Sequence, residues 1–315
     1  MTPTDTLAPT DDLTTTRAPF IEQSIGRGEL FIEQPYELYS EANQEAWRLL
    51  YRRMGDRWRQ YAHPKFLEGV DSLALNDRRI PRLADINQFL EPLSAFKAKA
   101  VAGYVPAYLF FDCLRRREFP TTITIRDQTT LDYLPEPDIF HDIAGHVPMH
   151  TDREFSDVLV RFGEVARTAA ARAGAIGDTE EKVRILESNL KALARFFWFT
   201  VEFGLMRRPG AAATGTDPKL CATGSGLLSS FGELEHCIES PQVQRYPFQL
   251  EWVINQGFEI DKYQPLLFFV DSFGHLFDQI STLERWLEEG RLDSVSAGEP
   301  GINDADLRSF LDAAP

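Results

Sequence analysis

Cysteine is scarce in this chain of 315 residues, which contains only Cys113, Cys221 and Cys237. The three lie far apart in the sequence, and no two of them form a Cys-x-x-Cys pair. An odd and dispersed set argues against a disulfide framework and against a metal site built from sulfur ligands. The pattern is typical of reduced thiols, so we expect a cytoplasmic protein.

Long apolar runs are also missing. The strongest ones, "PLLFFV" and "FFWF", are far shorter than the roughly 20 residues that a membrane-spanning helix needs. The start of the chain, "MTPTDTLAPTDDLTTTRAPF", has neither a basic first region nor an apolar centre, so it is not a secretory signal. We therefore expect no membrane partner.

Positive charge is in deficit, because 33 Lys and Arg face 48 Asp and Glu, which gives a net charge of −15. A nucleic-acid surface needs clustered basic residues to neutralise phosphates, so this balance argues against nucleic-acid partners. The chain does have 43% hydrophobic and 12% aromatic residues, a composition typical of a globular protein with a substantial core.

Helical periodicity dominates the sequence. One helix is predicted from the capping residue Ser40 to the stop at His63–Pro64, and another restarts after "AGAIGDTEE" and runs to about Arg207. Further helices are predicted over 64–75, 81–96, 107–119, 152–173 and 271–290. A short strand is predicted at 121–125, "TTITI", and a strand, a glycine turn and a helix over 219–239. The expected fold class is mostly α, a single domain of packed helices with a few short β-strands.

The two ends of the chain differ from its middle. Residues 1–25 are rich in Thr, Pro and Asp and are predicted to be disordered, and residues 296–315 form a polar, weakly patterned tail. Residues 26–295 contain no internal repeat and no linker long enough to divide domains. This middle range is therefore predicted to be the one catalytic domain.

The segment "DIFHDIAGHVPMH", residues 138–150, holds three of the six histidines. His141 and His146 are five residues apart, which does not fit the spacing of four in an HExxH zinc-protease helix. On a regular α-helix that spacing separates the two side chains by about 140°. The rings converge on a metal only if the helix ends or bends, and Gly145 and Pro148 supply a break. The alternative is one capping and one buried histidine.

A third candidate ligand lies in "FFWFTVEFGLM", residues 196–206, which is apolar nearly all round and predicts a buried helix. A lone carboxylate such as Glu202 costs several kcal/mol there unless it is paired or bound to a cation. Pairing with an arginine is the simpler reading. The sharper hypothesis is a facial triad of His141, His146 and Glu202, the usual ligand set of non-haem Fe(II) oxygenases. His150 is a weaker fourth candidate.

Three motifs, "PEPDIFHDIAGHVP", "WFTVEFGL" and "GSGLLSSFGEL", resemble in order and spacing those of the pterin-dependent aromatic amino acid hydroxylases. The resemblance covers roughly residues 30 to 290 and is strongest to bacterial members that act on phenylalanine. It implies the catalytic-domain fold of that family and Fe(II) held by His141, His146 and Glu202. It also implies tetrahydrobiopterin and O₂ as co-substrates.

The resemblance also implies roles for individual residues of this chain. It places along the pterin Val105, Ala107, Phe110, Asp142 and Phe197. It places around the amino acid substrate Arg126, Pro137, Asp138, Trp198, Phe203 and Ser229, with Arg126 binding the carboxylate through two parallel bonds. Without the resemblance, the stretch that contains Val105, Ala107 and Phe110 would be interpreted as the packing of a core helix, and Arg126 as a surface arginine.

The resemblance implies hydroxylation of L-phenylalanine to L-tyrosine. The sequence shows no separate regulatory domain before the catalytic region and no leucine-heptad helix at its end, so we expect a monomer. Two departures are visible, because many relatives have Tyr at Phe197 and Tyr-Gly-Ala-Gly where this chain has "TGSG" at 223–226. Trp198, in place of a smaller aromatic residue, favours phenylalanine over tryptophan as the substrate. Ile260 disfavours tyrosine as the substrate, because tyrosine hydroxylases tend to carry a polar acidic residue there. The alternatives within the family are a tryptophan 5-hydroxylase and a phenylalanine 3-hydroxylase. Outside it they are a zinc hydrolase and a non-catalytic metal-binding protein.

Overall fold

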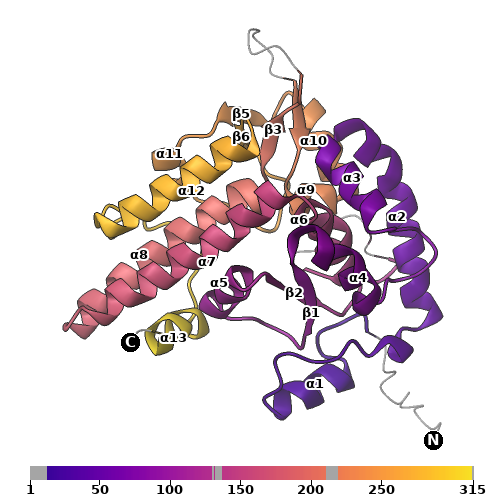
Figure 1. Ribbon diagram of the computed structural model, residues 1–315, viewed down its shortest axis with the longest axis horizontal. Coiled ribbons are helices and arrows are strands. Elements are labelled where there is room, and N and C mark those ends of the chain that lie inside the picture. The colour runs from indigo at the N-terminus through magenta and orange to yellow at the C-terminus, as the bar shows by residue number, and fades with distance from the viewer. Residues whose placement is uncertain (1–12, 130, 132–136, 211–218, 314–315) are drawn as a thin grey trace, which may run out of the picture.

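The structure is a computed structural model that describes residues 13–129, 131, 137–210 and 219–313 (Figure 1). Residues 1–12 of the predicted disordered segment and most of the loop before residue 219 lie outside the described ranges. The protein is mostly helical with two small sheets, so the predicted fold class is confirmed. Within the described ranges, no helix combines the length and the apolar character that a membrane crossing requires.

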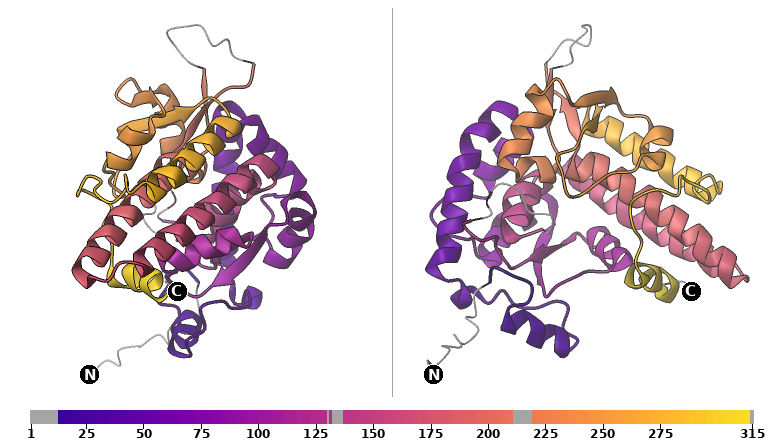
Figure 2. Two further views of the ribbon diagram at one scale, coloured as in Figure 1. Left: turned by 60° about the vertical axis from the view of Figure 1, so that its left-hand side comes forward. Right: turned by 180° about the vertical axis from the view of Figure 1, so that it is seen from behind.

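Three long helices lie side by side and form one half of the molecule (Figures 1 and 2). They are α7 (Arg153–Gly174), α8 (Thr179–Phe197) and α12 (Phe273–Glu288). Each begins at a side chain that accepts a backbone N–H one turn on: Asp152, Asp178 and Ser272. Phe162 of α7 packs against Phe111 of α5 (Ala107–Arg115) and Phe197 of α8, which fixes α5 across the pair.

The other half is built from the N-terminal helices (Figure 1). They are α1 (Pro19–Gly26), the short turn η1 (Tyr36–Leu38), α2 (Glu41–Tyr61), α3 (Pro64–Ser72) and α4 (Leu83–Ser94). The predicted start of α2 is confirmed, because Ser40 and Asn43 form a reciprocal capping box. Trp47 and Trp58 of α2 pack on Phe140, the first residue of the segment that carries two of the candidate ligands.

Two small sheets position the ends of these helices. β1 (Lys97–Val101) pairs in parallel with β2 (Glu118–Thr122), and the second sheet has the order β4 (Leu220–Ala222), β3 (Leu205–Arg207), β6 (Leu266–Val270), β5 (Gln244–Pro247). The predicted strand at 121–125 is displaced, because its partner β1 ends opposite Thr122. The residues after Thr122 stay extended but change partners: Ile125 donates to the carbonyl of Leu13.

Both predicted tails contain ordered structure. Leu13 is fully buried and α1 begins at Pro19, so the disordered segment predicted over 1–25 is wrong for its described part. The polar tail contains α13 (Asp304–Ala313), which packs on α5, α7 and α8. Its apolar stripe is short and does not stand out in a polar sequence; it consists of Leu307, Phe310, Leu311 and Ala313.

The remaining helices surround the candidate site. They are two π-helical segments, η2 (Phe140–His146) and η3 (Trp198–Glu202), and the helices α6 (Val147–His150), α9 (Ser225–Leu228), α10 (Phe231–Glu239) and α11 (Leu250–Asn255). The helix predicted to run to Arg207 therefore ends ten residues early as an α-helix, at Phe197. The chain then leaves the π-helical turn as strand β3, because Gly204 allows a tight reversal next to Thr200.

The packing of α3 on α6 gives a stability prediction. A Cβ added at Gly69 would lie 2.0 Å from the carbonyl oxygen of Pro148, a clash with backbone that cannot move freely. Gly69→Ala should lower the free energy of unfolding by about 1–3 kcal/mol, measured by urea denaturation. Gly55→Ala in α2 is the matched control, because its Cβ meets only Arg59 Nη1, at 3.8 Å. It should be neutral or stabilising by up to about 1 kcal/mol; equal stability of both variants would contradict the close approach.

Candidate active site

The two histidines predicted to bind a metal lie on the π-helical segment η2. A π-helix bonds residue i to residue i+5, so side chains five apart lie near one face. The Nε2 atoms of His141 and His146 are 3.1 Å apart. The predicted convergence of the rings is confirmed, but the predicted break is wrong, because the chain stays helical through Gly145 and continues into α6.

The carboxylate of Glu202 meets the two histidines from the second π-helical turn, η3. Its Oε1 lies 3.1 Å from His146 Nε2, and its Oε2 lies 3.5 Å from His141 Nε2. The turn after Glu202 is closely packed, since a Cβ at Gly224 would lie 2.4 Å from the Glu202 carbonyl oxygen. The backbone that carries the carboxylate therefore packs closely against the turn at Gly224.

These three donors have the spacing of a metal site. Donor atoms at adjacent corners of a tetrahedron or octahedron with bonds of about 2.1 Å lie about 3.0 to 3.4 Å apart. The two Nε2 atoms are 3.1 Å apart, and the carboxylate of Glu202 lies 3.1 Å from His146 through Oε1 and 3.5 Å from His141 through Oε2. Two imidazoles and one carboxylate are a donor set that suits Fe(II), and three such ligands leave further coordination positions open.

The protonation of the site fits a cation. Burial lowers the pKa of His141 to about 4, so its imidazole is neutral at neutral pH and has a free lone pair. Burial by itself would raise the pKa of Glu202, but the imidazole of His146, that of His141 and the hydroxyl of Ser225 outweigh it and lower the pKa to about 2. Glu202 is thus an anion in apolar surroundings.

A second carboxylate, that of Asp142, also lies near the histidines. One ligand atom from each of His141, Asp142 and His146 falls within 4.8 Å of the others. However, Asp142 Oδ2 accepts the backbone N–H of Thr122 at 2.6 Å, and burial raises its pKa to about 7. A carboxyl that is half protonated near neutral pH and committed to a backbone amide is a poorer ligand than Glu202. The hydrogen bond and the raised pKa of Asp142 therefore favour Glu202 as the carboxylate ligand.

Ser225 contacts this site and was not singled out from the sequence. Its hydroxyl donates to Glu202 Oε2 at 2.8 Å and lies 2.8 Å from His146 Nε2. The only signal was indirect, because Ser225 belongs to the "TGSG" turn that departs from the family pattern. The turn reaches the site because β4 pairs with β3, which follows Glu202 directly.

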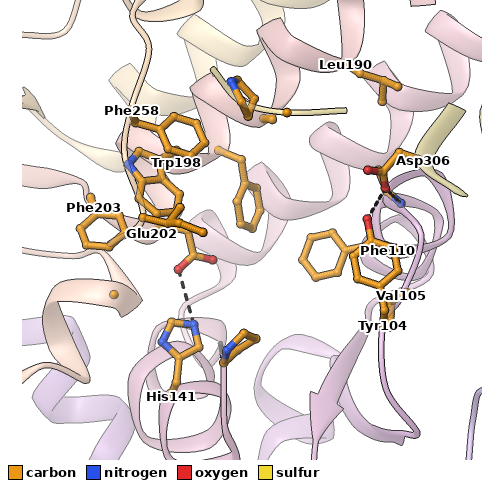
Figure 3. Close-up of a pocket in the computed structure, with 18 of the residues that line it drawn as sticks. Tyr104, Val105, Phe110, His141, Leu190, Trp198, Glu202, Phe203, Phe258 and Asp306 are labelled. Atoms are coloured by element: carbon orange, nitrogen blue, oxygen red, sulfur yellow. Dashed lines mark hydrogen bonds and ion pairs between the residues drawn. The ribbon is translucent and has the colours of Figure 1, made fainter. Parts of the chain in front are cut away.

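A cavity of about 400 Å³ opens beside His141 and Glu202 (Figure 3). Eleven of the predicted site residues line it: Val105, Ala107, Phe110, Arg126, Pro137, His141, Phe197, Trp198, Glu202, Phe203 and Ser229. His146, Asp138 and Asp142 are not among the described residues of its lining, so the expectation that Asp142 faces the pterin is not supported. The volume lies in the range of small-ligand pockets.

Arg126 is a buried residue, 4% exposed, which rules out the surface reading. Its Nε and Nη2 donate to the two oxygens of Asp138, at 2.8 and 2.9 Å. Burial opposes ionisation of Asp138, but the guanidinium outweighs it and holds the pKa of that carboxyl below its usual range. Within the described residues, the third nitrogen, Nη1, makes long contacts of 3.4 and 3.5 Å with the carbonyls of Leu131 and Ser229.

Aromatic side chains build the wall beside Glu202. The indole of Trp198 stacks on Phe258 with ring centroids 4.0 Å apart and lies 4.4 Å from Phe203 (Figure 3). Its Nε1 donates to Gln264 Oε1 at 3.1 Å, which fixes the plane of the ring. Phe258 was not predicted, because it lies in an irregular segment without periodicity.

The other candidate ligands stay apart from the site. His150 is fully buried, and neither ring nitrogen has a hydrogen-bond partner in the described part of the chain. Its ring centroid is 6.0 Å from that of His146, and it packs between Phe96 and Phe119. The three cysteines are buried and free, as predicted.

Comparisons with known proteins agree with this geometry. The family model described as biopterin-dependent aromatic amino acid hydroxylase matches residues 32–289. Phenylalanine-4-hydroxylase of Mesorhizobium japonicum is 36% identical over 263 residues, which cover 84% of this chain and 87% of that protein. Phenylalanine-4-hydroxylase of Ralstonia nicotianae is 33% identical over 302 residues, which cover 95% of this chain and 89% of that protein.

Solved structures give the same result. The structure of Chromobacterium violaceum phenylalanine hydroxylase with bound oxidised Fe(III) superimposes with a TM-score of 0.73 at 32% sequence identity. The match covers 87% of this chain and 92% of that one. A structure of the same protein bound to cobalt has a TM-score of 0.72.

The competing carboxylates give a test of the donor set. Glu202→Ala should bring the Fe(II) content of the purified protein to well below half of one equivalent, because two imidazoles alone hold the ion weakly. Asp142→Asn should keep close to the wild-type content. Iron is measured by atomic absorption on protein reconstituted under anaerobic conditions. The reverse order of the two variants would identify Asp142 as the ligand.

Proposed function

Because this chain belongs to the biopterin-dependent aromatic amino acid hydroxylase family, we propose that it hydroxylates L-phenylalanine to L-tyrosine. It is a non-haem iron monooxygenase that uses O₂ and tetrahydrobiopterin. One observation carries this function: His141, His146 and Glu202 converge at the edge of a cavity walled by aromatic rings. The donors supply an iron site with open positions, and the cavity can hold an aromatic substrate beside it.

His141, His146 and Glu202 are the residues that we propose hold Fe(II). When bound, the iron and the reduced pterin together supply the activation of O₂ and the oxidising power for attack on the ring. Overall, one oxygen atom enters the ring, and the pterin provides the two electrons that reduce the other. The chain keeps His141 neutral and Glu202 ionised through burial and hydrogen bonds.

We propose that Arg126 and Ser229 bind and orient the amino acid. Asp138 takes Nε and Nη2 of Arg126, so the two parallel bonds expected for the substrate are made to Asp138 instead. Nη1 has two long contacts within the described residues, and we propose that this nitrogen meets the substrate carboxylate. Ser229 Oγ lies 2.9 Å from Nδ1 of His141, so it fixes that ring while its backbone carbonyl approaches Arg126. The carboxylate is thereby held near the metal side of the cavity.

The substrate ring then lies against the wall of Trp198, Phe203 and Pro137. The indole is held both by stacking on Phe258 and by Gln264, so the wall is rigid. A rigid wall leaves a slot for one six-membered ring and disfavours an indole substrate. The zinc-hydrolase alternative needs a base that activates water, and Asp142 is committed to the amide of Thr122.

For the pterin we propose the opposite end of the cavity, beside Val105, Ala107 and Phe110 (Figure 3). Phe110 and Phe197 meet edge to face with centroids 5.5 Å apart, so the two rings support one another. A flat heterocycle can stack on such a face, and apolar walls exclude water from the reaction. Phe197 completes this wall without the phenol that many relatives carry.

The expected setting is a monomer in the cytoplasm with a single catalytic domain. The three buried, free cysteines support a reducing compartment. The partners that we propose are small molecules: an aromatic amino acid, a reduced pterin and O₂.

An aerobic assay tests the function. Protein reconstituted with Fe(II) and supplied with tetrahydrobiopterin should convert phenylalanine to tyrosine, identified by mass and ring position. Tryptophan and tyrosine should react at kcat/KM values at least about ten-fold lower, the discrimination expected of a hydrophobic pocket. Protein loaded with Zn²⁺ instead should show no hydroxylation. A 3-hydroxylated product, or hydrolase activity with zinc, would overturn the assignment.

Arg126→Lys tests the carboxylate site. Lysine cannot pair with both oxygens of Asp138 and also present a planar donor to the substrate. The KM for phenylalanine should rise by roughly ten-fold or more, with the pterin KM changed by less than about two-fold. Steady-state kinetics with each substrate varied in turn measures both constants. An equal rise in both would assign Arg126 a structural role only.

A further inference from the structure

The part of the chain that follows the family-model match forms one side of the cavity. The family model matches residues 32–289, but four residues after this range also line the cavity: Pro300, Gly301, Ile302 and Asp306. Asp306 lies at the end of the cavity that holds Tyr104, Val105 and Phe110, away from His141 and Glu202 (Figure 3). We call residues 298–310 the strap.

The first end of the strap is anchored from α8. Arg195 is fully buried, and it donates from Nε to the carbonyl of Glu299 at 2.7 Å and from Nη2 to that of Gly298 at 2.9 Å. Its Nη1 donates to the carbonyl of Ile254 at 2.8 Å. A buried guanidinium with these donors satisfied by carbonyls holds its partners firmly, because each broken bond leaves a buried polar group unpaired.

The second end of the strap is anchored by α13. Phe310 is fully buried and packs edge to face on Tyr108 of α5, with ring centroids 5.1 Å apart. Ser309 Oγ accepts the backbone N–H of Tyr108 at 3.2 Å. The strap therefore crosses the cavity between two buried anchors.

Asp306 connects the strap to the segment before α5. That helix starts after Pro106, whose side chain offers no capping acceptor. Asp306 Oδ1 takes over this role and accepts the N–H of Ala107 at 3.0 Å as well as the hydroxyl of Tyr104. The N–H of Asp306 donates to Asn303 Oδ1 at 2.9 Å, so one buried carboxylate lies at the amino ends of both α5 and α13, where negative charge is stabilised.

We propose that the strap is a wall of the pterin subsite and that Asp306 is the positioning residue that fixes the backbone of 104–107 beside the pterin. This inference rests on the proposed function, which puts the pterin next to Val105, Ala107 and Phe110. Because Asp306 occupies the N–H of Ala107, that group does not bind the pterin. Recognition at this end falls to Val105, to the ring of Phe110 and to the strap residues themselves.

Equilibrium binding tests the proposal without turnover. Tetrahydrobiopterin is titrated under anaerobic conditions into Fe(II)-loaded protein, and the Kd is measured by calorimetry. Asp306→Ala should raise the Kd roughly ten-fold, because it leaves the amide of Ala107 and the hydroxyl of Tyr104 without their acceptor. The pterin KM should rise in parallel, whereas kcat at saturating pterin and the phenylalanine KM should change by less than about two-fold.

Two further variants separate this role from a general loss of structure. Asp304→Ala is the matched control, since its side chain is exposed on the first turn of the same helix and its one ion pair within the described residues is with Arg308. It should leave the Kd unchanged. Ile302→Ala keeps every hydrogen bond of the strap, removes one apolar side chain from the wall and should raise the Kd roughly five-fold. If Asp306→Ala does not fold, the Kd of Ile302→Ala tests whether the strap is a wall of the pterin subsite.

The outcomes distinguish a failure of the strap proposal from a failure of the proposed function. Wild-type protein that binds the pterin while folded Asp306→Ala and Ile302→Ala bind it equally well would overturn the role of the strap alone. An equal loss of pterin and phenylalanine affinity in Asp306→Ala would overturn it too. Wild-type protein that neither binds tetrahydrobiopterin nor hydroxylates phenylalanine would overturn the proposed function itself.

Discussion

The site depends on two short stretches of π-helix that face each other across the cavity edge. A regular α-helix would turn His141 and His146 away from one another, and a regular continuation of α8 would change the direction in which Glu202 points. Such turns are less favourable than α-helix, so the surrounding packing must hold them in place. Trp47, Trp58 and the backbone of α9 do this for η2, and the "TGSG" turn does it for η3.

Three buried charged groups around the cavity, Arg126, Arg195 and Glu202, each have specific partners. Arg126 is paired with Asp138, and Arg195 with three backbone carbonyls. Glu202 has hydrogen-bonding partners on both oxygens. Desolvation of any of these groups without its partner costs several kcal/mol, so the polar layer specifies one arrangement of the helices around it.

Most of the architecture and the three donors could be predicted from the sequence, and the failures have physical causes. Helices with clear stripes and caps, such as α2 and α7, were found because local residues determine them. The π-helical geometry could not be predicted, because it is imposed by packing rather than by local preference. Phe258, Ser225 and Asp306 were missed because their roles arise from contacts with segments distant in the sequence. The displacement of β2 likewise follows from where its partner ends.

The cap of α5 has a consequence for the order in which the molecule forms. Asp306 and Ala107 are 199 residues apart, so this bond closes one of the largest loops in the protein. Contacts of such long separation form late in folding, after the local helices. During synthesis, the segment 104–107 leaves the ribosome long before its acceptor exists. The half of the cavity that holds His141 and Glu202 can therefore assemble first, and the opposite half becomes fixed only when α13 docks.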